Sequence, residues 1–252
     1  IGAVTNHMSH NSPNMAQVPA VHSPYGKECR ECWTVEDIDN YRLVGADASG
    51  LELRCLAHYI DDPNYTKEIL EGDVHTANMK AAGITDRDQA KTFIYAFLYG
   101  AGPSKIGSIV GEDARSGQQL ITKFLRAMPK LSHFREKTMQ QAEETGMVKG
   151  LDGRYFHIKS NHSTVNTLLQ GAGAIICKDW LCNIVEYINE KGLDAQPVAN
   201  IHDEVQFEVH KTDAEELCNV SKQAIKDTEE SLNVRCPLDS ESKVGFNWAE
   251  TH

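Results

Sequence analysis

Two short β-rich segments that carry acidic residues most constrain what this chain can fold into. Residues 43–46 (Leu-Val-Gly-Ala) predict a buried strand that places Asp47 at its end. In residues 198–207, two β-rich arms flank a polar His-Asp-Glu tip, which predicts a hairpin with Asp203 at the turn. A carboxylate at the end of a buried strand is costly unless a cation or a hydrogen-bond donor meets it. Both acids therefore need partners.

If the hairpin lies beside the first strand, Asp47 and Asp203 can share a pair of divalent ions. Two ions about 3.5–4 Å apart are the usual arrangement for in-line displacement at phosphorus. Either segment alone is more often an ordinary polar turn. A function can be inferred only from their combination with the helix that lies between them in the sequence.

That helix is predicted over residues 87–100, with Thr85 as its N-cap and a glycine at its end. Arg87, Lys91 and Tyr95 follow an i, i+4, i+8 spacing, so they share one face and span about 12 Å at 1.5 Å per residue. That length suits a triphosphate with its sugar. The apolar residues expected to face the core are Ala90, Phe93, Ile94 and Phe97. The alternative is an ordinary amphipathic helix with solvated cations.

Three motifs in this order resemble those of a known family. The patterns D-x-S-x-x-E-L-R (residues 47–54), R-x3-K-x3-Y-x3-Y-G (87–100) and H-D-E (202–204) resemble motifs A, B and C of family A, the DNA polymerase I superfamily. The surrounding stretches GLELRCLAHY and AKTFIYAFLYGAG are similar to its phage replicative branch. Each motif alone is weak, but three separated motifs in the right order are specific, and the resemblance covers nearly the whole chain.

The resemblance implies an α+β fold. The expected architecture is a right-hand polymerase palm, a small antiparallel sheet plus helices, with an inserted all-helical fingers subdomain. The palm would comprise residues 1–60 and 147–252, and the fingers residues 61–146. In the family, a thumb and an exonuclease-like domain lie upstream, so we expect this chain to be a C-terminal palm and fingers fragment from which both are absent.

The resemblance also implies a metal site. Asp47, Asp203 and the backbone carbonyl of Ala48 would hold two Mg²⁺ ions, one activating the primer 3′-hydroxyl and the other neutralising the pyrophosphate. Glu204 would act close to them, more as a neighbour of the ligands than as a ligand. Lys91 would add positive charge and protonate the leaving group.

The nucleotide-binding residues that the resemblance implies are Arg87, Lys91, Tyr95, His75, Glu52 and Tyr99. His75 would approach the β-phosphate, although a histidine at a helix start is the simpler interpretation. Glu52 would block a 2′-hydroxyl and hydrogen-bond to Tyr99. Tyr95 carries a hydroxyl where some relatives have Phe, which predicts ready acceptance of dideoxynucleotides.

The DNA-binding residues that the resemblance implies are Asn166, Gln170, His202, Arg154, Gln17 and His7. Asn166 and Gln170 are amides at i, i+4 that would check the minor-groove acceptors shared by all base pairs. They could equally be solvated polar residues. His7 stands where the family has an arginine that reaches the primer terminus, and Ala96 stands where it usually has glycine. Histidine is shorter and mostly neutral at pH 7, so His7 lacks the length and the fixed charge of that arginine.

Charge and cysteine usage limit the remaining classes. The net charge of −11 argues against a generic nucleic-acid-coating protein, although a cleft can still be locally positive. Seven cysteines are an odd number without framework spacing, and the lone C-x-x-C at residues 29–32 lacks a second pair for zinc. We find no signal peptide and expect no membrane-spanning segment. A reducing, intracellular setting is therefore expected, and the resemblance to the phage branch implies the cytoplasm of a bacterial host cell.

The rest of the chain reads mostly as helices with short loops. Residues 1–40 are expected to be extended chain with turns, and a D-G signal predicts a hairpin around residues 151–154. The predicted helices cover residues 51–59, 65–70, 74–82, 85–99, 105–110, 115–127, 130–144, 162–191 and 212–232.

The function implied is template-directed transfer of a deoxynucleoside monophosphate from a dNTP to the 3′-hydroxyl of a primer paired with template DNA. A two-metal nuclease also needs paired carboxylates, but it has no use for the stripe of Arg87, Lys91 and Tyr95. A catalytically silent palm and fingers module that folds without extending primers is the other alternative. We expect a monomer, with any processivity factor, such as a thioredoxin-like clamp, bound through the thumb.

Overall fold

A computed structural model describes residues 3–252, so Ile1 and Gly2 of the predicted first palm segment lie outside the described residues. The chain divides into two compact units. The first comprises Ile1–Leu51 and Gly173–His252, and the second comprises Glu52–Ala172. The inserted unit is longer on both sides than the predicted fingers, residues 61–146. The palm and fingers division itself stays a prediction.

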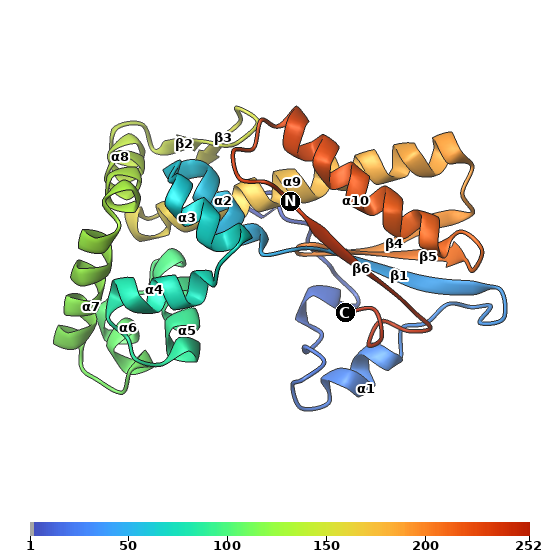
Figure 1. The fold of residues 1–252 in the computed structure, drawn as a ribbon, viewed down its shortest axis with the longest axis horizontal. Coiled ribbons are helices and arrows are strands. Elements are labelled where there is room, and N and C mark those ends of the chain that lie inside the picture. Colours follow the sequence, from blue (N-terminus) through green and yellow to red (C-terminus); the bar gives the residue numbers. More distant parts are fainter. Residues whose placement is uncertain (1–2) are drawn as a thin grey trace. The chain divides into compact units, whose positions relative to one another are not determined.

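The first unit is built on a four-stranded antiparallel sheet (Figure 1). In spatial order its strands are β4 (Ala195–Ile201), β5 (Glu204–His210), β1 (Tyr41–Ala48) and β6 (Ser240–Gly245). Strands β4 and β5 form the predicted hairpin, and β5 pairs along the length of β1. The hairpin therefore does lie beside the first strand. This was the condition under which Asp47 and Asp203 could share metal ions.

Strand alternation gives this sheet two different faces. On β1 and β5, Val44 and Ala46 lie opposite Phe207 and Val205, and all four are buried. This apolar face packs against α10 (Ala214–Ser231), and Figure 1 shows α9 (Thr164–Lys191) on the same side. The other face carries polar residues and is approached by α1 (Gly26–Glu31) and the end of the chain.

Helix α9 is the long core helix. Residues Asn161–Lys191 are long and apolar enough to cross a membrane by length and composition, contrary to the expectation that no such segment exists. However, 61% of the apolar stretch is buried inside the protein. In the first unit the indole of Trp180 is fully buried and donates to the carbonyl of Ser221 at 2.9 Å. A core helix of a globular protein explains this composition.

The second unit is mainly helical. Aspartates cap several of its helices: the side chains of Asp62, Asp73, Asp86 and Asp113 accept hydrogen bonds from first-turn backbone N–H groups. Its elements are α2 (Leu51–Ile60, starting at the unit boundary), α3 (Pro63–Leu70), α4 (Val74–Ala82), α5 (Arg87–Leu98), α6 (Pro103–Ile109), α7 (Ala114–Ala127), α8 (Pro129–Thr145), β2 (Met147–Lys149), β3 (Tyr155–His157) and η2 (Asn161–Ser163).

The predicted fold class is confirmed: the protein is a mixed helical and sheet fold with a small antiparallel sheet. Two local predictions were wrong, and one strand was missed. Asp86, not Thr85, caps α5, because its carboxylate reaches the N–H of Gln89 at 2.8 Å. Helix α1 and the 3-10 turn η1 (Met15–Gln17) interrupt a region expected to be extended. Strand β6 was not predicted, since an edge strand of mixed polarity gives little periodic signal.

Candidate active site

Sheet register brings the two predicted metal-binding acids together. Asp47 is the second-last residue of β1, and Asp203 lies in the two-residue turn between β4 and β5. The N–H of Ala48 donates to the carbonyl of Asp203 at 3.0 Å. His202, the other turn residue, has φ = +59°, an uncommon value for a residue with a Cβ. The tight turn thus holds Asp203 against the end of β1.

Electrostatics show that the acids crowd one another. Burial raises the pKa of Asp47 to about 6, and the charges of Asp203 and Glu204 add to the effect. Burial also raises the pKa of Asp203, with Glu204 contributing. Partly buried carboxylates with raised pKa values are typical of functional sites, because the protein holds like charges together that a cation or a proton must compensate.

The donor set fits a hard divalent cation. Two carboxylates and a nearby backbone carbonyl are oxygen ligands of the kind that Mg²⁺ prefers, while the rest of its shell is normally water and substrate phosphate. Among residues 3–252, no group of three or more His, Cys, Asp or Glu side chains forms a closed metal cage.

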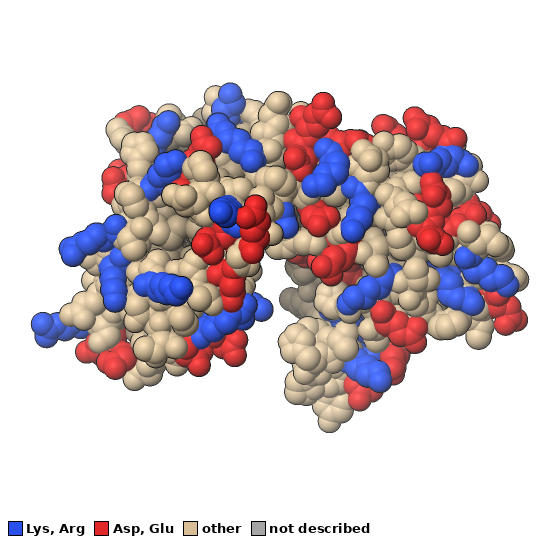
Figure 2. Space-filling view, viewed as in Figure 1, with Lys and Arg blue, Asp and Glu red and all other residues tan. Residues whose placement is uncertain are grey.

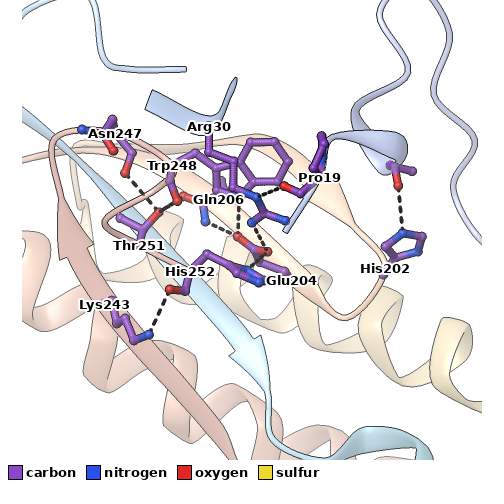
Figure 3. Close-up of polar contacts among 11 residues, drawn as sticks. Pro19, Arg30, His202, Glu204, Gln206, Lys243, Asn247, Trp248, Thr251 and His252 are labelled. Carbon is purple, nitrogen blue, oxygen red and sulfur yellow. Dashed lines mark hydrogen bonds and ion pairs between the residues drawn. The ribbon is translucent and has the colours of Figure 1, made fainter. Parts of the chain in front are cut away.

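Glu204 lies opposite Asp47 in the register but its carboxylate has protein partners (Figure 3). It is 3% exposed. Trp248 Nε1 donates to one carboxylate oxygen at 2.7 Å, and His252 Nδ1 contacts the other at 2.6 Å. Burial alone would raise the pKa of Glu204, but the hydrogen bond and charge of His252 together with the other donors lower it. The structure thus surrounds Glu204 with donors; its catalytic role stays a prediction.

Three predicted DNA-binding residues lie in the first unit. His202 is exposed at the hairpin tip and its Nε2 lies 3.3 Å from the carbonyl of Ala16, next to Gln17. His7 is half-buried, and its pKa is lowered by burial and by the nearby charges of His202 and Lys178. His7 and His202 are therefore close to each other at the hairpin end that carries Asp203.

In the second unit, helix α5 presents the predicted polar stripe. Ala90, Phe93, Ile94 and Phe97 are buried, as predicted. Arg87 and Lys91 are exposed, and Tyr95 is half-buried. His75, in the first turn of α4, lies beside Tyr95 with ring centroids 6.2 Å apart, and burial followed by the charges of Arg87 and Lys91 lowers its pKa. Four of the predicted nucleotide-binding side chains therefore gather on one surface.

Arg87 already has an anionic partner. Its Nε and one terminal nitrogen donate to the two carboxylate oxygens of Asp73 at 2.7 and 3.0 Å. Asp73 also caps α4, and the guanidinium holds the pKa of that carboxyl well below its usual range. Both side chains are largely exposed. A phosphate that binds Arg87 must therefore compete with Asp73.

The predicted hydrogen bond between Glu52 and Tyr99 is present. Tyr99 Oη donates to one oxygen of Glu52 at 3.0 Å, and Gln170 Nε2 lies 3.4 Å from the other oxygen. Asn166, one turn earlier on α9, has a buried side-chain oxygen without a hydrogen-bond partner. Arg154, at the β2–β3 turn, is exposed and paired with Asp152 at 2.6 Å. The DNA-binding roles of Arg154, Asn166 and Gln170 stay predictions.

Charges on the surface are mixed. On the face seen in Figure 2, Lys and Arg side chains are interspersed with Asp and Glu side chains. This distribution agrees with a net charge of −11 and with the expectation that affinity for bare DNA is weak.

Sequence reasoning missed several residues that shape the site. Arg30, Gln206, Trp248 and His252 contact Glu204, and Asp73 contacts Arg87. The only local signal was Asp73 at a helix start, which indicates a cap and says nothing of Arg87. Gln206 lies two residues from Glu204 on β5, but Arg30, Trp248 and His252 come from two segments far away in the sequence, so no spacing rule could connect them.

Comparisons with known proteins agree with this geometry. The sequence profile of DNA polymerase family A matches residues 1–250. The chain is 44% identical to a DNA-directed DNA polymerase of Enterobacteria phage T3 and 43% identical to one of Escherichia phage T7, over 100% of its own length and 40% of theirs. It spans less than half the length of these relatives.

The fold is also shared with a solved structure. The POL domain of Pol1 from M. smegmatis, in complex with DNA primer-template and dNTP, superposes with a TM-score of 0.88 at 20% identity. The match covers 98% of this chain and 47% of that one. At this identity the likeness concerns the fold. The full-length family match and the phage relatives are decisive: this chain belongs to DNA polymerase family A.

Proposed function

We propose that this chain carries the catalytic part of a phage-type replicative DNA polymerase, which transfers deoxynucleoside monophosphates from dNTPs to the 3′-hydroxyl of a primer on a DNA template. The observation that supports it most is the pairing of Asp47 and Asp203 at the end of two adjacent strands, with both pKa values raised. Membership of family A supplies the reaction class.

Family A DNA polymerases are generally metal-dependent. We assign the two Mg²⁺ ions of the proposed reaction to Asp47, Asp203 and the carbonyl of Ala48. Bound there, they would lower the pKa of the primer hydroxyl and offset charge on the departing pyrophosphate. The two carboxylates would have to be ionised, and their crowding supplies the negative potential that attracts the cations.

The exposed stripe on α5 is proposed to hold the triphosphate. Lys91 and Arg87 would place fixed positive charge on the phosphates, and His75 would sit toward the β-phosphate. Lys91 would also give a proton to the leaving group. Arg87 would leave Asp73 for a phosphate oxygen, since an exposed ion pair contributes only about 0–1 kcal/mol.

Sugar selection is assigned to Glu52, held by Tyr99 and Gln170. Two hydrogen-bonding neighbours fix the carboxylate rotamer, so a 2′-hydroxyl would meet a rigid group. Tyr95 would sit under the sugar, and its hydroxyl could replace the hydrogen bond that a dideoxynucleotide lacks. This arrangement favours DNA over RNA synthesis and predicts ready use of dideoxynucleotides.

Partners and location follow from the same proposal. Primer-template DNA would contact Asn166, Gln170, His202, Arg154, Gln17 and His7, and dNTPs would contact α5. The protein is proposed to act as a monomer, with any processivity factor bound outside this chain. Cys29, Cys32 and Cys182 are exposed thiols outside any disulfide. These surface thiols and the phage relatives support a reducing location in the cytoplasm of a bacterial host.

The test is single-nucleotide primer extension with Mg²⁺, using both this chain and a longer form that restores the upstream sequence of its relatives. Asp47→Asn and Asp203→Asn should each reduce extension about 10³-fold, whereas Glu208→Gln, a carboxylate change further along β5 and away from the Asp203 turn, should not. Primer shortening instead of extension would establish the two-metal nuclease. Extension by the longer form only would show that this chain alone is the silent module, and a His7→Arg variant would test that contact separately.

A further inference from the structure

A buried polar cluster of the first unit lies directly beside the proposed metal ligands. Glu204 is its centre, and the residues around it come from α1, β5 and residues 246–252, here called the closing segment (Figure 3). His252 Nδ1 and Trp248 Nε1 contact one carboxylate oxygen each, at 2.6 and 2.7 Å. Gln206 Nε2 also donates to Glu204.

Arg30 completes the enclosure. Arg30 is 6% exposed, and its guanidinium stacks on the Trp248 ring, 4.1 Å from the centroid. Arg30 Nε donates to the carbonyl of Pro19 at 2.9 Å, whereas Nη1 lies 4.0 Å from Glu204 and has no hydrogen-bond partner. Trp248 and Pro19 therefore hold the Arg30 guanidinium in place, with its charge near the Glu204 carboxylate.

The donors are chemically matched to an ionised Glu204. A carboxylate only accepts hydrogen bonds, and an indole nitrogen only donates. The 2.6 Å contact therefore requires His252 Nδ1 to carry a hydrogen atom. The backbone of His252 is fixed in turn, because Lys243 Nζ donates to its carbonyl oxygen at 3.1 Å.

The sequence of β1 leaves room for this segment. Gly45 lies on the same strand face as Asp47 and opposite Gln206. A Cβ at Gly45 would collide with Thr251 and Gln206, whose side chains are themselves hydrogen-bonded at 2.9 Å. The closing segment therefore lies flat on the sheet face that carries Asp47, held there by contacts at Gly45, Gln206 and Glu204.

We propose that His252 and Trp248 are positioning residues for the proposed metal site. They hold Glu204 so that its oxygens cannot turn toward the metal ions, while its charge stays beside Asp47 and the β4–β5 turn stays fixed. This inference rests on the proposed function, because it assigns to the closing segment the task of shaping the site formed by Asp47 and Asp203.

Loss of the His252 donor would release one oxygen of Glu204. Because Glu204 lies directly opposite Asp47, the freed carboxylate would compete for the ligand positions and disturb the near-ideal octahedral geometry that Mg²⁺ demands. Changes to groups that orient metal ligands typically weaken metal binding or activity about 10–100-fold. We expect the lower end of that range, since Trp248 and Gln206 still hold the other oxygen.

The experiment compares His252→Leu with His252→Asn. Asparagine places an amide N–H near the position of Nδ1, whereas leucine has no donor. In this chain, a Mg²⁺ titration followed by the backbone amide NMR signals of Ala48 and Asp203 should show about tenfold weaker binding for His252→Leu and recovery for His252→Asn. His210→Gln, a histidine at the far end of β5, should match the wild type.

A second readout reports the geometry without metal. The chain has three tryptophans, so three indole N–H signals are expected. The Trp248 signal should move in His252→Leu and in Glu204→Gln, whereas the Trp180 signal, bonded to Ser221, should stay in place. In whichever form of the protein extends primers, this chain or the longer form, His252→Leu should raise the Mg²⁺ concentration that gives half-maximal extension about tenfold. The KM for dNTP should stay unchanged.

A double-mutant cycle tests whether His252 affects Mg²⁺ binding through Glu204. If His252 acts through Glu204, its loss should add little once Glu204 is replaced by Gln. Additive effects, or equal Mg²⁺ affinity in His252→Leu and the wild type, would overturn the inference. Absence of primer extension in all forms, with the NMR responses intact, would instead contradict the proposed function and leave the positioning role standing.

Discussion

The charged side chains of the two candidate sites differ in burial between the two units of the molecule. In the first unit, Asp47, Asp203 and Glu204 are partly or fully buried at fixed positions in a sheet, and their neighbours are locked by hydrogen bonds. In the second unit, Arg87 and Lys91 stand exposed on α5, and the ion pair of Arg87 can exchange with solvent.

This difference suits two different tasks. Metal ions require ligands held within narrow limits, and the carboxylates proposed to bind them are placed by strand register at the cost of electrostatic crowding. A triphosphate would arrive and leave in each proposed cycle, which agrees with Arg87 and Lys91 standing exposed on long side chains. We therefore expect changes in the first unit to alter stability and function together, and changes on α5 to alter function alone.

The largest effect is expected for Asp47→Asn. Extension should fall about 10³-fold, because the metals lose an anionic ligand worth several kcal/mol in the transition state. Stability should rise by about 1–2 kcal/mol at pH 7 with EDTA, since the raised pKa marks a destabilised charge and part of it is solvent-screened. Chemical denaturation measures this gain.

The pH dependence of the free energy of unfolding tests whether the Asp47 charge destabilises the fold. Because the folded-state pKa of Asp47, about 6, exceeds the ordinary 3.8, the native state binds more protons between these values. Metal-free wild-type stability should therefore fall relative to Asp47→Asn as pH rises from about 4 to 6. A stability difference that is independent of pH would contradict the assigned repulsion.

Lys91→Ala tests the opposite behaviour. The rate of nucleotide addition should fall about 10²–10³-fold, as is usual when a preorganised positive group facing the transition state is lost. The free energy of unfolding should stay within about 0.5 kcal/mol, because the side chain is exposed. Lys80→Ala, on neighbouring α4, is the matched surface control. A large loss of stability on replacing Lys91 would contradict the expectation that changes on α5 alter function alone.

Tyr95→Phe removes one hydroxyl from the α5 stripe. Discrimination against dideoxynucleotides should increase about tenfold or more, since the proposed substitute for the missing 3′-hydroxyl is lost. Ordinary dNTP addition should change little. Competition between dATP and ddATP in a single-site extension measures the ratio, and an unchanged ratio would remove Tyr95 from the sugar site.

The smallest effect is expected for Asp73→Asn. Asparagine can still cap α4 but no longer holds Arg87 by charge. The KM for dNTP should fall about two- to fivefold, the range that an exposed ion pair of up to about 1 kcal/mol allows. Asp113→Asn, at the capped start of α7, provides the control. A higher KM would show that Asp73 helps to orient Arg87 rather than competing for it.

Local sequence was a good guide to the second unit and to the hairpin. The core face of α5 follows from its 3.6-residue period, and the β4–β5 turn follows from a polar tip between β-rich arms. These patterns work because each residue's environment is set by near neighbours in the chain. The cap of α5 was misplaced by one residue, since Thr85 and Asp86 are both good caps and only the geometry selects one.

The sequence by itself determined which residue types carry the chemistry and, by their order, the family to which the chain belongs. Only the tertiary structure decided that Asp47 lies opposite Glu204, that Arg87 rests on Asp73, and that Trp248 and His252 enclose Glu204. The reason is physical. Contacts between segments far apart in the chain depend on strand register and on the path of loops, which leave no period in the sequence, whereas helices and turns are specified residue by residue.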